Sequence, residues 1–129
     1  MDKTIEQQVG VLVTYEQAKL LKEFGFDWEC NYWYHPADES LYESGDFYNH
    51  NSSETVYSAP TLSQVQKWIY DKFGWWIIPL MVEGNKFIFD ITDKYVEPVD
   101  QSFESFDTPF IALSKGIDKA LELLKEELQ

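Results

Sequence analysis

Residues 75 to 92 constrain the fold more than any other stretch of this chain. Two apolar, strand-forming runs flank Gly84-Asn85, a dipeptide typical of two-residue β-hairpin turns. With this dipeptide as the loop, Val82 pairs with Phe87, and one face of the hairpin becomes wholly apolar. Because a slip of one residue would break that agreement, the pattern predicts a well-specified register and a buried face. The side chains expected to be buried under helices are Ile78, Leu80, Val82, Phe87, Phe89 and Ile91.

The opposite face of the hairpin is more apolar than a solvated face requires. Trp75, Ile77, Met81 and Ile88 are expected there, either covered by other strands or offered to a partner. Pro79 has no backbone N–H to donate, so its strand is expected at a sheet edge or with a bulge at this point.

Two helices are predicted before the hairpin. The first follows Thr14, which forms a capping box with Gln17, and Gly25 closes it in a left-handed conformation. The second lies between Thr61, a good N-cap residue, and Gly74.

A third helix is predicted at the end of the chain. It starts at Asp107 or Thr108, and Pro109 is favourable at its first helical position. Its apolar stripe ends at Leu128. Gly116 lies off that stripe and costs up to about 1 kcal/mol relative to alanine.

Short strands separated by turns are predicted between the first two helices. Residues 28 to 35, 41 to 43, 47 to 48 and 55 to 58 have strand-like composition, and residues 9 to 13 form a further short strand or an extended arm. Residues 93 to 107 are predicted to be a polar connection. We therefore expect one α+β domain over residues 1–129, with an antiparallel sheet and three helices packed mainly on one face, in the order helix, short strands, helix, hairpin, helix.

The charge of the chain argues against one large class of function. It has 23 acidic residues, 10 lysines and no arginine, which gives a formal net charge of −13. Such a chain repels phosphate backbones and lacks the usual residue for bidentate phosphate contacts, so direct nucleic-acid binding is disfavoured. No apolar run is long enough for a membrane span, the N-terminus lacks the features of a signal peptide, and Cys30 is the only cysteine. We therefore expect a cytoplasmic protein.

The acidic charge is concentrated together with aromatic residues. Between Lys22 and Lys67 there is no basic side chain, but there are eight acidic and ten aromatic residues. This composition suits either a basic protein partner or mere solubility. The candidate interaction surface combines Trp28, Tyr32, Trp33 and Tyr34 with Trp75, Ile77, Met81 and Ile88 of the hairpin.

No motif indicates catalysis or a cofactor. Tyr15 and Lys19 have the spacing of a short-chain dehydrogenase pair, but the chain lacks the glycine-rich turn that this chemistry needs. His35, His50 and Cys30 follow no known metal-ligand spacing. The sequence therefore predicts no metal and no cofactor, and a small enzyme or metal protein built on His35 and His50 is kept only as an alternative.

Three segments resemble a group of small uncharacterised proteins from Bacteroides-type gut bacteria, their prophages and their phages. They are residues 18–26, residues 57–68 and residues 116–121. The resemblance implies a bacterial cytoplasm and phage or mobile-element biology, and it carries no functional residue. We expect a non-enzymatic protein-interaction or accessory protein, with self-association as one form of that interaction. The alternative is an acidic mimic of nucleic acid that inhibits a host defence or nucleic-acid-processing protein.

Overall fold

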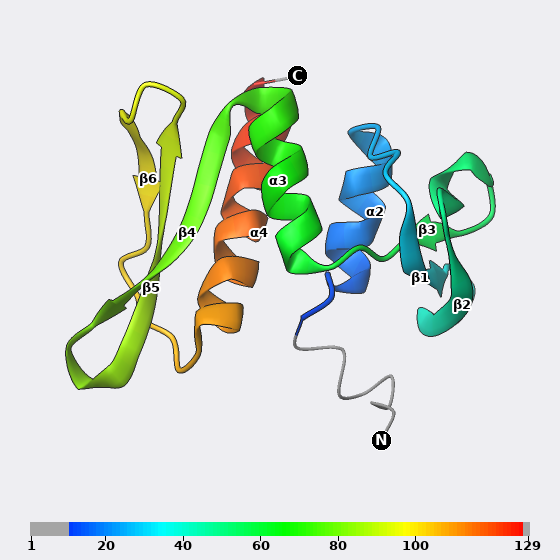
Figure 1. The fold of residues 1–129 in the computed structure, drawn as a ribbon, viewed down its shortest axis with the longest axis horizontal. Helices are drawn as coiled ribbons and strands as arrows, with labels where there is room; N and C mark the ends of the chain where they lie inside the picture. The colour runs from blue at the N-terminus through cyan, green and yellow to red at the C-terminus, as the bar shows by residue number, and fades with distance from the viewer. Residues whose placement is uncertain (1–10, 128–129) are drawn as a thin grey trace. The chain divides into compact units, whose positions relative to one another are not determined.

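The computed structural model describes residues 11–127, which fold as an α+β chain in the predicted order of helices and strands (Figure 1). In these residues there are three α-helices and two antiparallel sheets of three strands each. The chain divides into two compact units, Met1–Thr61 and Leu62–Gln129. That the whole chain forms one domain stays a prediction. Residues 9 and 10 of the expected first strand, and Leu128 of the last helical stripe, lie outside the described residues.

The first unit begins with helix α2 (Tyr15–Glu23), whose ends are those that the sequence predicts. Thr14 Oγ1 accepts a hydrogen bond from the Gln17 backbone at 3.1 Å, and the Gln17 side chain accepts one from the Thr14 backbone at 2.8 Å. Gly25 follows the helix with φ of 88°, the left-handed conformation in which glycine is favoured. The capping box and the closing glycine are therefore confirmed.

The sheet of this unit has the strand order β2-β1-β3, so β1 is central (Figure 1). The strands are β1 (Cys30–His35), β2 (Ser40–Tyr48) and β3 (Tyr57–Ser58), and the 3₁₀ turn η1 (His50–Ser52) precedes β3. Pairing of β2 with β1 is regular from Ser40 to Glu43 and then shifts, so the next residues bulge out. The sequence predicts two short strands here, whereas the structure has one strand with a bulge at its glycine, Gly45.

Aromatic and aliphatic side chains join α2 to this sheet. The Tyr34 hydroxyl, buried in the core, donates to the Val13 carbonyl oxygen at 2.8 Å. The Tyr15 ring contacts the rings of Tyr34 and Tyr57, each at a centroid distance of 5.7 Å. The N-terminal unit therefore has a core of its own, formed on the α2 side of its sheet.

The second unit contains two helices and the predicted hairpin. Its elements are α3 (Leu62–Phe73), β4 (Trp75–Val82), the turn η2 (Glu83–Asn85), β5 (Lys86–Asp93), β6 (Pro98–Gln101) and α4 (Pro109–Glu127). The strand order is β4-β5-β6. Helix α4 packs on β4 and β5, and α3 packs on β4 and α4 (Figure 1). Because β4 is an edge strand, the prediction made from Pro79 is confirmed.

The predicted register of the hairpin is wrong by one residue. The turn has three residues rather than two, with both Gly84 and Asn85 at positive φ, and Val82 pairs with Lys86. Ile77, which was expected on the outer face, lies opposite Ile91, and both are fully buried. The apolar pattern could not separate the two registers, because β4 is apolar on both faces and the turn length decides between them.

This one-residue difference in register moves part of the expected core toward solvent. On β5, Phe89 and Ile91 are buried as predicted, but on β4 the side chains of Leu80 and Val82 are exposed. Ile78 and Phe87, which were also expected in the core, are half-buried. Strand β6 was also missed, because residues 98–101 lie in a segment predicted to be a polar connection. In the described part of the chain, no helix is long and apolar enough to cross a membrane.

Candidate functional site

The outer strand of the N-terminal sheet presents an unusual set of exposed side chains. Tyr42, Phe47 and Tyr48 of β2 are 41%, 67% and 54% exposed. Glu43 and Asp46 on the same strand are exposed as well. We call these five residues the β2 surface. Exposed aromatic side chains are enriched at protein interfaces, because they supply a large contact area at a low cost in conformational entropy.

The local fold holds this surface in a definite form. The Tyr42 ring stacks on the Trp33 ring of β1 with centroids 4.6 Å apart. On the other face, the Tyr32 hydroxyl donates to Glu43 Oε2 at 3.2 Å, and burial together with this carboxylate raises the pKa of Tyr32. Tyr48 contacts the His50 ring edge-on at 5.4 Å. The rings of Tyr42 and Tyr48 are thus supported from β1 and from η1.

Lys22, the last lysine before the β2 surface in the sequence, binds to other residues of the first unit. Lys22 Nζ donates to the carbonyl oxygens of Ser53, at 2.5 Å, and Val56, at 2.7 Å, and lies 5.4 Å from the centroid of the Tyr57 ring. Burial lowers the pKa of Lys22, while Glu54 opposes this change. Since the sequence has no basic residue between Lys22 and Lys67, no lysine from the strands of this sheet neutralises Glu43 or Asp46.

The eight residues that the sequence predicts as an interaction surface belong to two different units. Four of them belong to the first unit: Trp28, Tyr32 and Trp33 are half-buried, and Tyr34 is buried. Trp33 and Tyr32 support the β2 surface through Tyr42 and Glu43. Tyr34 is 6% exposed and is a core residue, so it cannot contribute to an exposed surface.

The other four residues belong to the second unit and do not share one face. Ile77 is buried and faces α4, and Trp75 and Met81, two and four residues away on the regularly paired β4, lie on the same face as Ile77. Ile88 pairs with Leu80, which places it on the opposite face of the sheet. Met81, at 66% exposure, is the only strongly exposed member of the four. The expected common face is therefore wrong, for the same reason as the register.

Sequence reasoning missed the exposed aromatic residues at the end of β2. Phe47 and Tyr48 were grouped with other aromatics of the acidic interval, but not chosen as surface residues. The available signal was the sequence Ser44-Gly45-Asp46, because a glycine flanked by polar residues within a strand favours a bulge. A bulge breaks the simple alternation of inward and outward side chains, so both aromatic residues that follow it can be exposed.

The histidines and the cysteine have structural partners. His50 Nε2 lies 3.2 Å from the Cys30 carbonyl oxygen, and His35 Nδ1 accepts a hydrogen bond from the Ala37 backbone at 3.1 Å. Burial lowers the pKa of His50 and raises the pKa of the Cys30 thiol. Within residues 11–127, no three His, Cys, Asp or Glu side chains are grouped so that they could hold a metal ion.

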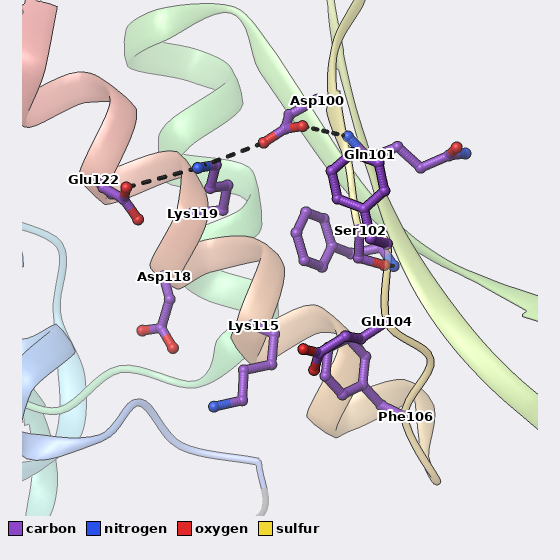
Figure 2. Close-up of a pocket in the computed structure, with 11 residues that line it drawn as sticks. Asp100, Gln101, Ser102, Glu104, Phe106, Lys115, Asp118, Lys119 and Glu122 are labelled. Carbon is purple, nitrogen blue, oxygen red and sulfur yellow. Dashed lines mark hydrogen bonds and ion pairs between the residues drawn. The ribbon is translucent and has the colours of Figure 1, made fainter.

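The second unit has a groove of about 410 Å³ between α4 and the segment that includes β6 (Figure 2). Figure 2 shows Lys119 of α4 between two carboxylates: its Nζ lies 3.9 Å from Asp100 and 3.6 Å from Glu122. A second, larger cleft of about 620 Å³ is lined by Tyr70 and Trp76, whose rings meet edge-to-face at 5.4 Å. Side chains of both charges line each cleft, so neither has the single sign of charge that marks the β2 surface.

Comparison with known proteins adds no assignment: no protein-family model, curated protein or solved structure matches this chain.

Proposed function

We propose that this protein is a non-enzymatic interaction module that binds a basic protein partner through the β2 surface. The observation that supports this proposal is the exposure of Tyr42, Phe47 and Tyr48 beside Glu43 and Asp46 on one outer strand. Aromatic anchors supply the desolvated centre of an interface, and uncompensated carboxylates attract cationic side chains at its rim. The resemblance to small proteins of gut bacteria and their phages would make the partner a bacterial protein.

The charge of the chain favours a different protein over a second copy of itself. Two copies of a protein with a net charge of −13 repel each other, and like charges placed together at an interface cost free energy. Self-association through the β2 surface would also bring Glu43 and Asp46 against the same acids of the other copy. A partner rich in lysine or arginine is instead attracted to these carboxylates, so electrostatics favours its binding and opposes the binding of a second copy.

The proposal is tested by capture from a bacterial lysate with three baits: the natural protein, the double variant Glu43→Lys/Asp46→Lys, and the control Glu126→Lys/Glu127→Lys. The control acids are exposed at the end of α4. Each exchange adds two charges, so both variants move from −13 to −9 (−13 + 2 × 2). Any difference between them therefore reflects the position of the charge rather than its amount.

We expect basic proteins to be captured by the natural protein and the α4 control, and to be lost with the β2 variant. Binding should weaken as salt is added, because salt screens exposed charges beyond about 10 Å at 0.1 M. Equal capture by the two double variants would contradict a role for the β2 surface.

A further inference from the structure

The two sheets have four edge strands, and one of them differs from the others in how its outward backbone groups are covered. An edge strand presents unpaired N–H and C=O groups, which form a template for another strand. Proteins commonly cover or remove these groups with side chains, prolines or bulges. The outer strands here are β2 and β3 in the first sheet, and β4 and β6 in the second.

The outward backbone groups of β3 are bound by side chains. Ser58 N–H donates to Asn51 Oδ1 at 2.8 Å, and the Val56 carbonyl just before the strand accepts from Lys22. Ala59 N–H pairs with the Tyr32 carbonyl of β1, so Ser58, one residue away, faces outward. The β3 edge is therefore occupied by hydrogen bonds from within its own unit.

The two edges of the second sheet are closed in part. On β4, the Gln66 side chain of α3 donates to the Ile77 carbonyl oxygen, and Pro79, the next residue that faces the same way, has no N–H. On β6, the strand starts with Pro98, and the Gln101 N–H donates to the Asp100 carboxylate at 2.8 Å. Each outer strand of this sheet thus carries a proline and a side-chain cap.

Strand β2 has none of these devices on the outward groups of its regular part. A side-chain cap, from the Ser40 N–H to Asp38 Oδ1 at 3.1 Å, lies at its first residue, which faces β1. Residues 40–43 contain no proline and no lysine, and their pairing with β1 is regular. The backbone of Tyr32 in β1 hydrogen-bonds to β3, so the backbone of the next residue, Trp33, points toward β2 and its partner Tyr42. The backbone groups of Leu41 and Glu43, on either side of Tyr42, therefore face away from β1. In the described chain, no side chain hydrogen-bonds to the backbone of Leu41 or Glu43. The bulge after Glu43 ends the regular pairing, so the open edge is limited to residues 40–43.

Taking the proposed function as its basis, we infer that an extended basic segment of the partner adds to the sheet beside β2, antiparallel to it. The open N–H and C=O groups of Leu41 and Glu43 supply the ladder. Side chains of the added strand alternate between two faces: those beside Glu43 meet a carboxylate, and those beside Tyr42 meet the Trp33–Tyr42 ring stack. The segment that fits has lysine or arginine at every second position and apolar residues between them.

Three peptides separate strand addition from simple charge attraction. The parent is a fluorescein-labelled octapeptide in which lysine alternates with valine. The second peptide carries N-methyl groups on its lysines and the third on its valines, so all three keep the same charge and the same side chains. In an antiparallel pair, the residue opposite Glu43 shares its face and directs its N–H to β2, so lysine N–H groups make the ladder. Binding to the natural protein is measured by fluorescence anisotropy at nanomolar peptide concentration.

We expect methylation of the lysines to weaken binding by about tenfold or more, and methylation of the valines to leave it nearly unchanged. Equal binding of all three peptides would overturn strand addition, while the proposed basic-partner surface would stand. Stronger loss on valine methylation would overturn the antiparallel arrangement. If none of the peptides binds, or if the Glu43→Lys/Asp46→Lys variant binds the parent as well as the natural protein does, the proposed function fails together with this inference.

Discussion

Gly116 of α4 lies directly against Ile77 of β4, so that a Cβ atom at residue 116 would stand 2.6 Å from Ile77 Cγ2. It would also stand 3.0 Å from Phe89 Cβ. The apolar periodicity of the sequence predicts Gly116 off the stripe, where glycine only weakens a helix. Instead, the glycine is buried at the contact between α4 and the sheet, and the absence of a side chain allows the close approach.

We expect Gly116→Ala to destabilise the protein although alanine is the better helix former. The gain in helix propensity is about 1 kcal/mol, whereas forcing a methyl group into a filled contact costs about 1–3 kcal/mol. Urea unfolding measures the net change. Ile77→Leu removes the Cγ2 branch, so the cost of Gly116→Ala should fall in that background. An unchanged cost there would show that the contact with Ile77 is not the cause.

Lys22→Met should lower the free energy of unfolding by about 1–3 kcal/mol, because the carbonyl oxygens of Ser53 and Val56 lose their donor. Lys19→Met is the matched control: it removes the same charge from an exposed position of the same helix and should change stability little. Denaturant midpoints of the two variants give the comparison. Equal midpoints would mean that Lys22 acts only through its charge.

Acidification should destabilise the N-terminal unit through His50. Burial lowers the pKa of His50 in the folded protein below the unfolded value of about 6.5, so the unfolded chain binds the proton more readily. The contribution of neutral His50 is fully present above pH about 6.5 and is lost as the pH falls from there through the folded-state pKa. Unfolding free energies of the natural protein and His50→Gln, compared at several pH values, should therefore converge on acidification. A constant difference between the two proteins would contradict this linkage.

The Cys30 thiol should resist alkylation in the folded protein. Its side chain is 1% exposed and burial raises its pKa, so little reactive thiolate is present. Labelling with iodoacetamide, followed by mass spectrometry, should proceed slowly until denaturant is added. Rapid labelling under native conditions would show that the region around β1 opens readily.

Phe47→Ser and Tyr48→Ser should impair partner binding without lowering stability. Both side chains are more than half exposed, and exposed substitutions usually change stability by less than about 0.5 kcal/mol. Their loss from the centre of an interface should weaken binding to the captured basic protein by about tenfold or more. Tyr95→Ser, at an exposed aromatic residue of the second unit, is the control. If all three variants bind alike, the aromatic residues of β2 do not act as anchors.

The local signals in the sequence predicted the helices well. The capping box at Thr14, the closing glycines Gly25 and Gly74, and Pro109 at the first position of α4 all lie where the pattern placed them. These signals depend only on neighbouring residues, so the tertiary structure of the rest of the chain does not change them. The α+β class follows from them together with the hairpin.

The candidate surface was harder to predict, because it depends on pairings between distant residues. Ile77 and Tyr34 are aromatic or apolar residues in strands, as Phe47 is, yet only the register and the bulge decide which of them are buried. A strand apolar on both faces, such as β4, gives no internal evidence for either register. The sequence also did not show which outer strands have backbone groups bound by side chains. Gln66 and Lys22 reach their carbonyl partners only in the folded chain.

The hydrogen bonds described above for the first unit are all made by residues early in the chain. Thr14, Lys22, Asn51 and the three strands of the first sheet lie within Met1–Thr61. During synthesis, this part leaves the ribosome before α3 does, and domains generally fold as units, with the N-terminal one first. Strand β2 can thus be present on a nascent chain, and the proposed partner would then meet it while translation of the second unit is still in progress.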